Sequence, residues 1–369
     1  MDMKRWGQVV LLGILIGVLG VPPDAFSVLA RQQQGPGSSP PVQQPTPPKP
    51  PSGQQQGGQQ QQQAPPPQVS ISVEANVVNV DAVVTDQDGN IITDLKKENF
   101  RILDGTAPQQ ITNFAPSEAP LTIVILMEFS NKSYGFWPGG FGYKAKDWAY
   151  GFLNHLTDKD WVAFKTFDMN TTLRVDFTHN RQEVAQAIMS LFYPGFREAN
   201  LFDAILETLD QLRDVRGKKS ILVLATGYDT FSKHTLDQTY RHLKETDVPI
   251  FCVGMGEEID LYRNSPISYS QAKNQLTQFA EMTGGYAWFP RFQGEMGDIF
   301  SSIAAFLRSQ YTLGFTPSTP QDGRYHKIKV EIVDNQGNPL LVADKKGKMK
   351  KVTVYARQGY MAPNAASGD

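Results

Sequence analysis

Alternating apolar and polar residues dominate the first part of the chain that has a regular pattern, residues 69–116. Alternation with a period of two predicts strands that bury one face. The phase of the alternation changes near Val77, which predicts a bulge or bend there because a one-residue shift exchanges the two faces. Asp88-Gly89 is a hairpin turn signal, and we expect a return strand to begin at Ile91-Ile92.

Residues 119–310 alternate between short apolar runs and amphipathic segments with helical spacing. This order predicts a parallel sheet with crossover helices. The expected strands are 121–127, 161–167, 171–177, 220–225, 249–253 and 286–289, and the expected helices are 145–156, 181–191, 201–212, 236–245, 272–283 and 296–308. We expect 171–177 to be an antiparallel strand at the edge of the sheet.

Residues 311–362 return to strict alternation, most clearly from His326 to Ile332. Neither this segment nor 69–116 has enough strands to be stable alone. We therefore predict that the two segments pair as one discontinuous antiparallel β-sandwich. The predicted fold class is α/β: a doubly wound, mostly parallel sheet formed by 117–310 and inserted in that sandwich.

The N-terminus has the pattern of an export signal, residues 1–30. Lys4 and Arg5 precede an apolar run, and Val28-Leu-Ala30 is a small-residue cleavage site. The apolar run is shorter than the ~20 residues that span a bilayer. This pattern predicts export to the periplasm, cell envelope or extracellular space, with an uncleaved anchor as the alternative.

Low-complexity sequence follows the signal. Residues 31–68 are almost entirely Gln, Pro, Gly and Ser, which cannot bury enough apolar surface to fold. We expect a disordered tether there and a disordered tail at 363–369. The single cysteine, Cys252, excludes an intrachain disulfide.

The formal net charge is −2, which gives no field that would attract nucleic acid or an anionic membrane, and we expect no membrane insertion of the mature domain. Lysines cluster in one expected hairpin loop, which we interpret as a solvated turn. They are Lys345, Lys346, Lys348, Lys350 and Lys351.

The apolar strand 121–127 ends abruptly in Glu128, Ser130 and Lys132. In open α/β sheets, ligands bind at the carboxyl ends of the strands. Two further loops should meet this end, one before the helix at 201 and one after the strand 220–225.

Several short motifs, in order along the chain, resemble those of one protein family. They are Asn79–Asp86, Leu95–Phe100, Leu201–Ile205, Gln310–Phe315 and Val354–Tyr360. The family consists of exported bacterial proteins, abundant in acidobacteria, that carry a von Willebrand factor type A-related domain between β-segments. The resemblance covers nearly everything after the tether.

The resemblance implies a metal-ion-dependent adhesion site in which Asp-x-Ser-x-Ser, a Thr and an Asp hold a divalent cation. The matching positions here are Glu128, Ser130, Lys132, Ala199 and Thr226. The Glu128 side chain is longer than that of Asp, Ala199 offers only a methyl group, and Lys132 carries a positive charge. These side chains do not suit octahedral coordination of a cation by oxygen atoms. We therefore expect a degenerate site without metal or other cofactor, with the ammonium of Lys132 paired to Glu128.

Aromatic residues crowd the same three loops. The predicted partner-binding residues are Tyr134, Phe136, Trp137, Phe141, Tyr143, Tyr193, Phe196, Arg197 and Tyr228. Convergent aromatics with an arginine are typical of contact surfaces. The expected partner is a protein or a glycan. The alternative is that these rings pack beneath their own loops.

No enzyme motif is complete in this sequence, and the five histidines are scattered. We expect a non-enzymatic, metal-independent adhesion-type module. Two alternatives stay open: a metal-dependent adhesion domain that uses Glu128 and Ser130, and a structural component of the envelope.

Overall fold

The structure is a computed structural model that describes residues 77–116, 120–131, 141–194, 196–254, 268–318 and 322–363. These residues belong to one compact unit, Ile71–Asp369. The predicted signal, the tether and nearly all of the predicted tail lie outside the described residues. So does most of the strand expected before Val77.

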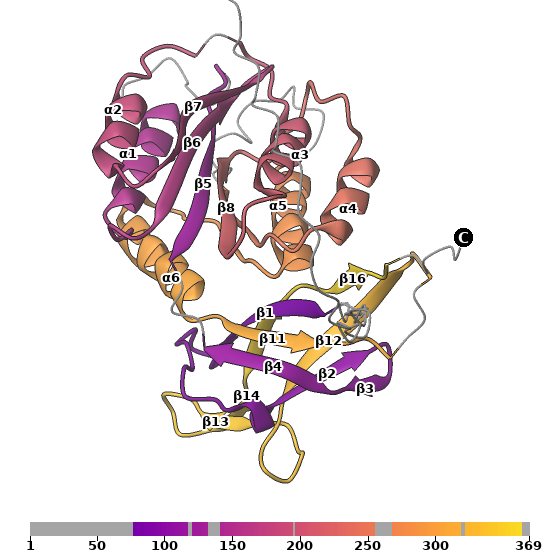
Figure 1. Cartoon of the computed structure of the whole chain (residues 1–369). Coiled ribbons are helices and arrows are strands. Elements are labelled where there is room, and N and C mark those ends of the chain that lie inside the picture. The colour runs from indigo at the N-terminus through magenta and orange to yellow at the C-terminus, as the bar shows by residue number, and fades with distance from the viewer. Residues whose placement is uncertain are drawn as a thin grey trace, which may run out of the picture. The chain divides into compact units, whose positions relative to one another are not determined.

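Among the described residues, six strands form one sheet in the order β10-β9-β8-β5-β6-β7. Figure 1 labels the neighbouring strands β8, β5, β6 and β7. The bounds of the six strands are β5 Leu121–Glu128, β6 Trp161–Phe167, β7 Thr171–Thr178, β8 Lys218–Ala225, β9 Ile250–Gly254 and β10 Ala287–Trp288. The sheet is parallel except for β7, which pairs antiparallel to β6 at the edge. The predicted antiparallel edge strand is confirmed.

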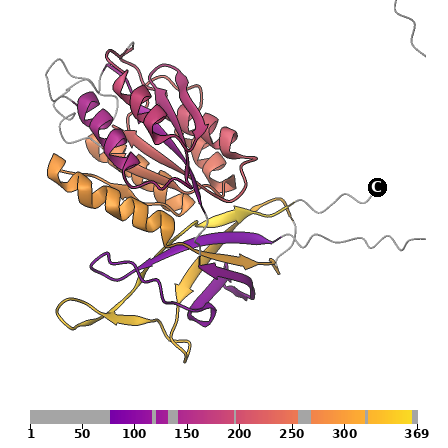
Figure 2. The ribbon, with the colours of Figure 1, turned by 60° about the vertical axis from the view of Figure 1, so that its left-hand side comes forward.

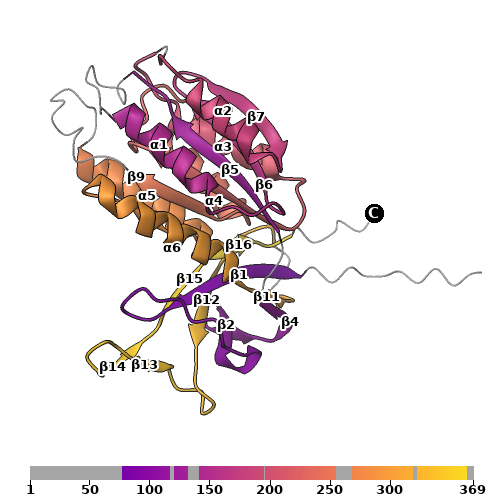
Figure 3. The ribbon, with the colours of Figure 1, turned by 90° about the vertical axis from the view of Figure 1, so that its left-hand side faces the viewer.

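Helices cover both faces of this sheet (Figures 2 and 3). Their bounds are α1 Phe141–Leu153, α2 Arg181–Met189, α3 Leu201–Leu212, α4 Leu236–Glu245, α5 Tyr269–Thr283 and α6 Met296–Arg308, with short 3-10 turns at Lys97–Asn99 and Gln293–Glu295. α1, α2 and α6 pack on one face, and α3, α4 and α5 on the other.

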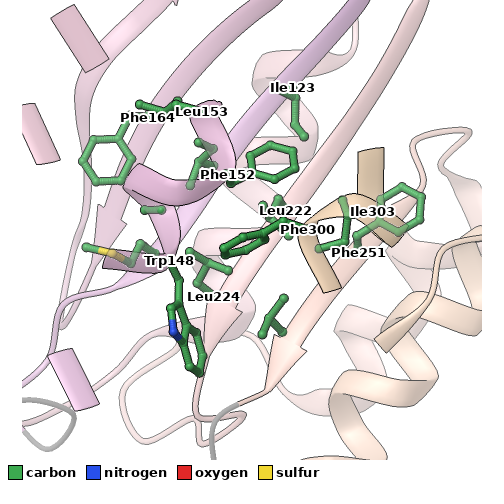
Figure 4. Close-up of a cluster of buried hydrophobic side chains, with 14 of the residues drawn as sticks. Ile123, Trp148, Phe152, Leu153, Phe164, Leu222, Leu224, Phe251, Phe300 and Ile303 are labelled. Atoms are coloured by element: carbon green, nitrogen blue, oxygen red, sulfur yellow. The ribbon is translucent and has the colours of Figure 1, made fainter. Parts of the chain in front are cut away.

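β5 is buried on both faces, which explains its uninterrupted apolar sequence. Ile123 and Ile125 face the core on the α1 side, whereas Val124 and Leu126 face the core on the α3 side. Figure 4 shows the core on the α1 side, where the ring centroids of Phe152 and Phe300 lie 5.9 Å apart.

The segments on either side of the six-stranded sheet pair with each other. The described residues form two four-stranded antiparallel sheets, β15-β1-β11-β4 and β16-β12-β2-β3, and a β13-β14 hairpin. The bounds are β1 Val78–Thr85, β2 Phe100–Asp104, β3 Ala107–Gln109, β4 Ile111–Pro116, β11 Tyr311–Phe315, β12 Tyr325–Ile332, β13 Leu341–Ala343, β14 Met349–Lys351, β15 Thr353–Ala356 and β16 Gly359–Met361. The two sheets share one core, in which Val80 of β1 lies with Ile102 of β2.

β1 serves two cores because its residues alternate. Val80, Ala82 and Val84 face the core between the four-stranded sheets, whereas Val83 packs into the α1-side core of the six-stranded sheet. The return strand predicted at Ile91-Ile92 is reduced to a short antiparallel pairing, in which Ile91 bridges Thr85 and Ile92 N donates to Val84 O at 2.9 Å. The hydroxyl of Tyr311 binds the carbonyl of Ile92 at 3.0 Å and the N–H of Leu95 at 3.0 Å, so the segment follows this ring instead.

The buried carboxylate of Asp160 joins three elements at the amino end of the central strands. It accepts hydrogen bonds from Leu121 N (3.0 Å), Thr157 N (2.7 Å) and Arg308 Nη2 (2.7 Å). Burial alone would raise the pKa of Asp160, but these hydrogen bonds outweigh it and lower the pKa to about 2. No helix among the described residues is long and apolar enough to cross a membrane.

Candidate functional site

The described parts of the three loops that we expected to converge do meet, at the carboxyl ends of β5 and β8. Loop one follows β5, loop two joins α2 to α3, and loop three follows β8. Asn131 N in loop one donates to Phe196 O in loop two at 2.5 Å. Ala199 O in loop two accepts from Thr230 N (2.8 Å) and Phe231 N (3.1 Å) in loop three. Backbone hydrogen bonds therefore fix the loops to one another.

Glu128 links loops one and three through its side chain. Its Oε1 accepts from Ser130 Oγ at 2.8 Å. Its Oε2 accepts from Thr226 N at 2.8 Å and from Thr226 Oγ1 at 2.7 Å. All three residues are buried. We call this group the Glu128 latch. The predicted partner of Glu128, Lys132, lies outside the described residues.

At this position the described side chains supply one carboxylate, Glu128, and two hydroxyl groups, Ser130 and Thr226. Mg²⁺ requires near-octahedral coordination by oxygen atoms. Both carboxylate oxygens of Glu128 already face hydrogen-bond donors, and the buried Ala199 supplies no side-chain oxygen. Within the described ranges, no cluster of three His, Cys, Asp or Glu side chains could hold a metal ion.

Two aspartates that the sequence analysis did not single out fasten loop three to the start of α3. Asp229 Oδ2 accepts from Phe202 N at 2.9 Å and from Ser232 Oγ at 2.5 Å. Burial raises the pKa of Asp229 despite these bonds. Asp229 and the Leu201–Ile205 motif are visible in the sequence, but their spacing does not reveal these hydrogen bonds.

Asp203, the second of these aspartates, orients His234. Its carboxylate accepts from Lys233 N (2.8 Å) and from His234 N (3.1 Å), and it lies 2.7 Å from His234 Nδ1. Burial would raise the pKa of Asp203, but these hydrogen bonds lower it. His234 is therefore held in place by a carboxylate.

Four large aromatic side chains are exposed on loops two and three. The exposed fractions are 67% for Phe192, 88% for Tyr193, 47% for Phe196 and 49% for Phe231. Arg197, between them in sequence, is also exposed. We call these five residues the aromatic loop surface.

A lysine of α1 supports the beginning of loop two. Lys146 Nζ donates to Leu191 O at 2.5 Å and lies 5.5 Å from the centre of the Phe192 ring. Burial lowers the pKa of Lys146. The ammonium group thus anchors the loop next to its exposed rings.

The prediction that Tyr228 lines the contact surface is wrong, because its side chain is 3% exposed and belongs to the core on the α1 side. Gly227 has a φ of +85° and lies against α5, where a Cβ would come within 2.8 Å of Ala272 O. Gln275 Nε2 also donates to Gly227 O at 2.9 Å. This tight turn directs the next side chain inward. Phe129 of loop one is likewise buried.

The remaining predicted contact residues are not placed. Tyr134, Phe136 and Trp137 lie outside the described residues. Phe141 and Tyr143 are in the first turn of α1, but their side chains are outside the described part of the structure.

Solved structures resemble the chain at low identity. BatB, a conserved hypothetical protein from Bacteroides thetaiotaomicron, has a TM-score of 0.42 and 13% identity over 51% of this chain and 100% of that chain. A von Willebrand factor type A protein from Catenulispora acidiphila has a TM-score of 0.43 and 11% identity over 77% and 75%. The vWF domain of the pilus tip protein Mfa5 from Porphyromonas gingivalis has a TM-score of 0.39 and 12% identity over 50% and 95%. Likenesses this distant say nothing about function.

No curated protein matches the chain. A family model does match part of the chain, and it describes the same type of domain that the sequence motifs implied. Within this chain, residues 123–289, from β5 to just after β10, match the family model of the von Willebrand factor type A domain.

Proposed function

We propose that the chain is an exported, non-enzymatic binding module of adhesion type that engages a protein partner through the aromatic loop surface. The observation that carries this proposal is the exposure of Phe192, Tyr193, Phe196 and Phe231 at the carboxyl end of the sheet. Single exposed apolar residues are ordinary, but several exposed aromatic residues on linked loops, with an arginine among them, have the composition of a contact surface.

The fixed backbone of the loops also favours binding. Association costs free energy when loops and side chains must be ordered. Here Asn131, Ala199 and Thr230 already join the three loops through hydrogen bonds. A partner would therefore meet a surface whose backbone is largely preorganised.

Binding through this surface would not need a metal ion. The Glu128 latch satisfies the carboxylate with hydrogen bonds from Ser130 and Thr226. Protein donors thus perform the joining of loops that a cation would otherwise perform. The contact roles predicted for Tyr134, Phe136, Trp137, Phe141 and Tyr143 stay predictions.

Photo-crosslinking tests the partner and its location. A photoreactive amino acid at position 193 should capture a protein in the native envelope, since this side chain is the most exposed of the four aromatic side chains. Capture should be lost in Phe196→Ala and kept in Tyr150→Ala, because both side chains are 47% exposed but Tyr150 lies on α1.

The outcomes separate the alternatives. A crosslink to a glycan would change the partner class. If Phe196→Ala lowers Tm strongly, the ring packs against its own loop and the contact proposal fails. Calorimetry with Mg²⁺, Mn²⁺ and Ca²⁺ tests metal independence. Micromolar binding that disappears in Glu128→Ala would show instead that the metal-dependent alternative is correct.

A further inference from the structure

The β13-β14 hairpin forms a two-stranded sheet of its own among the described residues (Figure 1). Its strands and connecting turn carry a cluster of lysines. They are Lys345, Lys346, Lys348, Lys350 and Lys351. The proposed function does not use this hairpin.

The pairing register places apolar and cationic groups on the same face. Leu341 lies opposite Lys351, and Ala343 lies opposite Met349. Directly opposed residues share a face of a sheet. Leu341 is 44% exposed and Met349 is 55% exposed, whereas Val342, on the other face, is half-buried. One face of the hairpin therefore presents two aliphatic side chains bordered by lysines.

The five lysine ammonium groups have no ion-pair partner among the carboxylates that the structure describes. Within the described ranges, none of the five forms a salt bridge with a carboxylate. The nearby carboxylates bind backbone N–H groups instead. Asp344 Oδ1 accepts from Lys346 N and Lys348 N, and Asp88 Oδ2 accepts from Lys345 N. Together with the three nearby carboxylates, Asp86, Asp88 and Asp344, the hairpin region carries five positive and three negative charges. The net charge of the whole chain, by contrast, is −2.

We propose that this hairpin docks on the surface of a bilayer that contains anionic lipids. The aliphatic side chains of Leu341 and Met349 would enter the headgroup region while the lysines contact phosphates, an arrangement typical of interfacial segments. The composition argues against nucleic acid, because residues 341–351 contain no aromatic ring for base stacking and no arginine.

The expected affinity follows from the number of charges. Each lysine near an anionic membrane surface strengthens binding roughly fivefold, from about 1 kcal/mol per charge. Replacing three of them by glutamine should therefore weaken binding roughly a hundredfold. The effect should shrink at high ionic strength, because salt screens exposed charges.

Vesicle sedimentation with the full chain tests the proposal. The vesicles contain phosphatidylcholine alone or with phosphatidylglycerol. The triple variant Lys345→Gln, Lys346→Gln and Lys348→Gln should lose most of its preference for anionic vesicles. A matched triple variant, Lys96→Gln, Lys97→Gln and Lys159→Gln, makes the same charge change at exposed positions elsewhere and should bind like the wild type. The N-terminal segment is identical in all three proteins, so the differences report the hairpin.

A second variant tests the apolar contribution. Leu341→Ser with Met349→Ser should weaken binding to anionic vesicles while Tm stays unchanged, because both side chains are exposed. Three results would overturn the proposal: equal binding by the hairpin lysine variant and the wild type, equal loss in the matched variant, or equally tight binding to a DNA duplex at the same salt concentration.

Discussion

Replacing Asp160 by asparagine should remove a stabilising charge while keeping the size of the side chain. The pKa of Asp160 falls from its ordinary 3.8 to about 2 in the folded protein. Each pKa unit corresponds to about 1.4 kcal/mol, so the ionised carboxylate stabilises the folded state by roughly 2.5 kcal/mol at neutral pH. The Asp160→Asn protein should be less stable by about that amount at pH 7.

The pH dependence of this difference has a defined sign. A carboxylate with a lowered pKa stabilises the folded state fully above its unfolded pKa of 3.8 and loses this contribution as pH falls towards about 2. Urea unfolding of Asp160→Asn and the wild type, from pH 7 down to pH 2, should therefore give curves that approach each other in acid. Other carboxylates titrate in both proteins and cancel in the difference.

Asp158→Asn is the matched control. Asp158 also binds an arginine, with Arg181 Nη2 at 2.6 Å, but its side chain is 90% exposed. Exposed ion pairs contribute little, so this variant should lose less than about 1 kcal/mol. A stability difference for Asp160→Asn that does not change between pH 7 and pH 2 would refute the reasoning, as would an equal loss in Asp158→Asn.

Three further substitutions test other parts of the structure. Thr226→Val should cost about 1–3 kcal/mol in urea unfolding, because Glu128 loses a buried donor, and the same change should cost clearly less in a Glu128→Ala background; equal costs would exclude coupling in the latch. The hydrogen bond with Asp322 raises the pKa of His326, so its stabilising effect is present below pH 6.5 and is lost as pH rises through the folded pKa. The Tm difference between the wild type and His326→Gln should accordingly be larger at pH 6 than at pH 9, and the opposite trend would contradict this assignment. Gly285→Ala should lower Tm strongly, since the added Cβ would lie 2.0 Å from a backbone carbonyl of β9; an unchanged Tm would show that the close approach is not as described.

Much of the six-stranded sheet could be predicted because its hydrophobic periodicity is regular. The expected bounds of the helices at 201–212, 236–245 and 296–308 agree with α3, α4 and α6, and the strand at 161–167 agrees with β6. The apolar residues of a long amphipathic helix recur with helical spacing because they line its buried face. The helix ends can therefore be predicted from where this spacing begins and stops. The helix expected at 145–156 instead begins at Phe141, in an aromatic and glycine-rich stretch where the helical pattern is weak.

The candidate site was less predictable because it depends on backbone turns and side-chain reach. The sequence predicted that Glu128 and Thr226 lie at the same edge of the sheet. It did not predict the two hydrogen bonds that Thr226 donates to Glu128. Tyr228 was expected on the surface because aromatic content alone does not show direction. The positive φ of Gly227 and its contact with α5 decide that direction, and both arise from tertiary packing.

The pairing of β4 with β11 sets an order of events during synthesis. Pro116 and Tyr311 are cross-strand partners, yet the whole von Willebrand factor type A segment separates them along the chain. At ribosomal speeds of about 5–20 residues per second, β4 must wait roughly 10–40 s for its neighbour. The six-stranded sheet can be complete before then, whereas β1, β2 and β4 emerge early with exposed edges. A chaperone that shields those edges would therefore act on the first β-segment, long before its partners leave the ribosome.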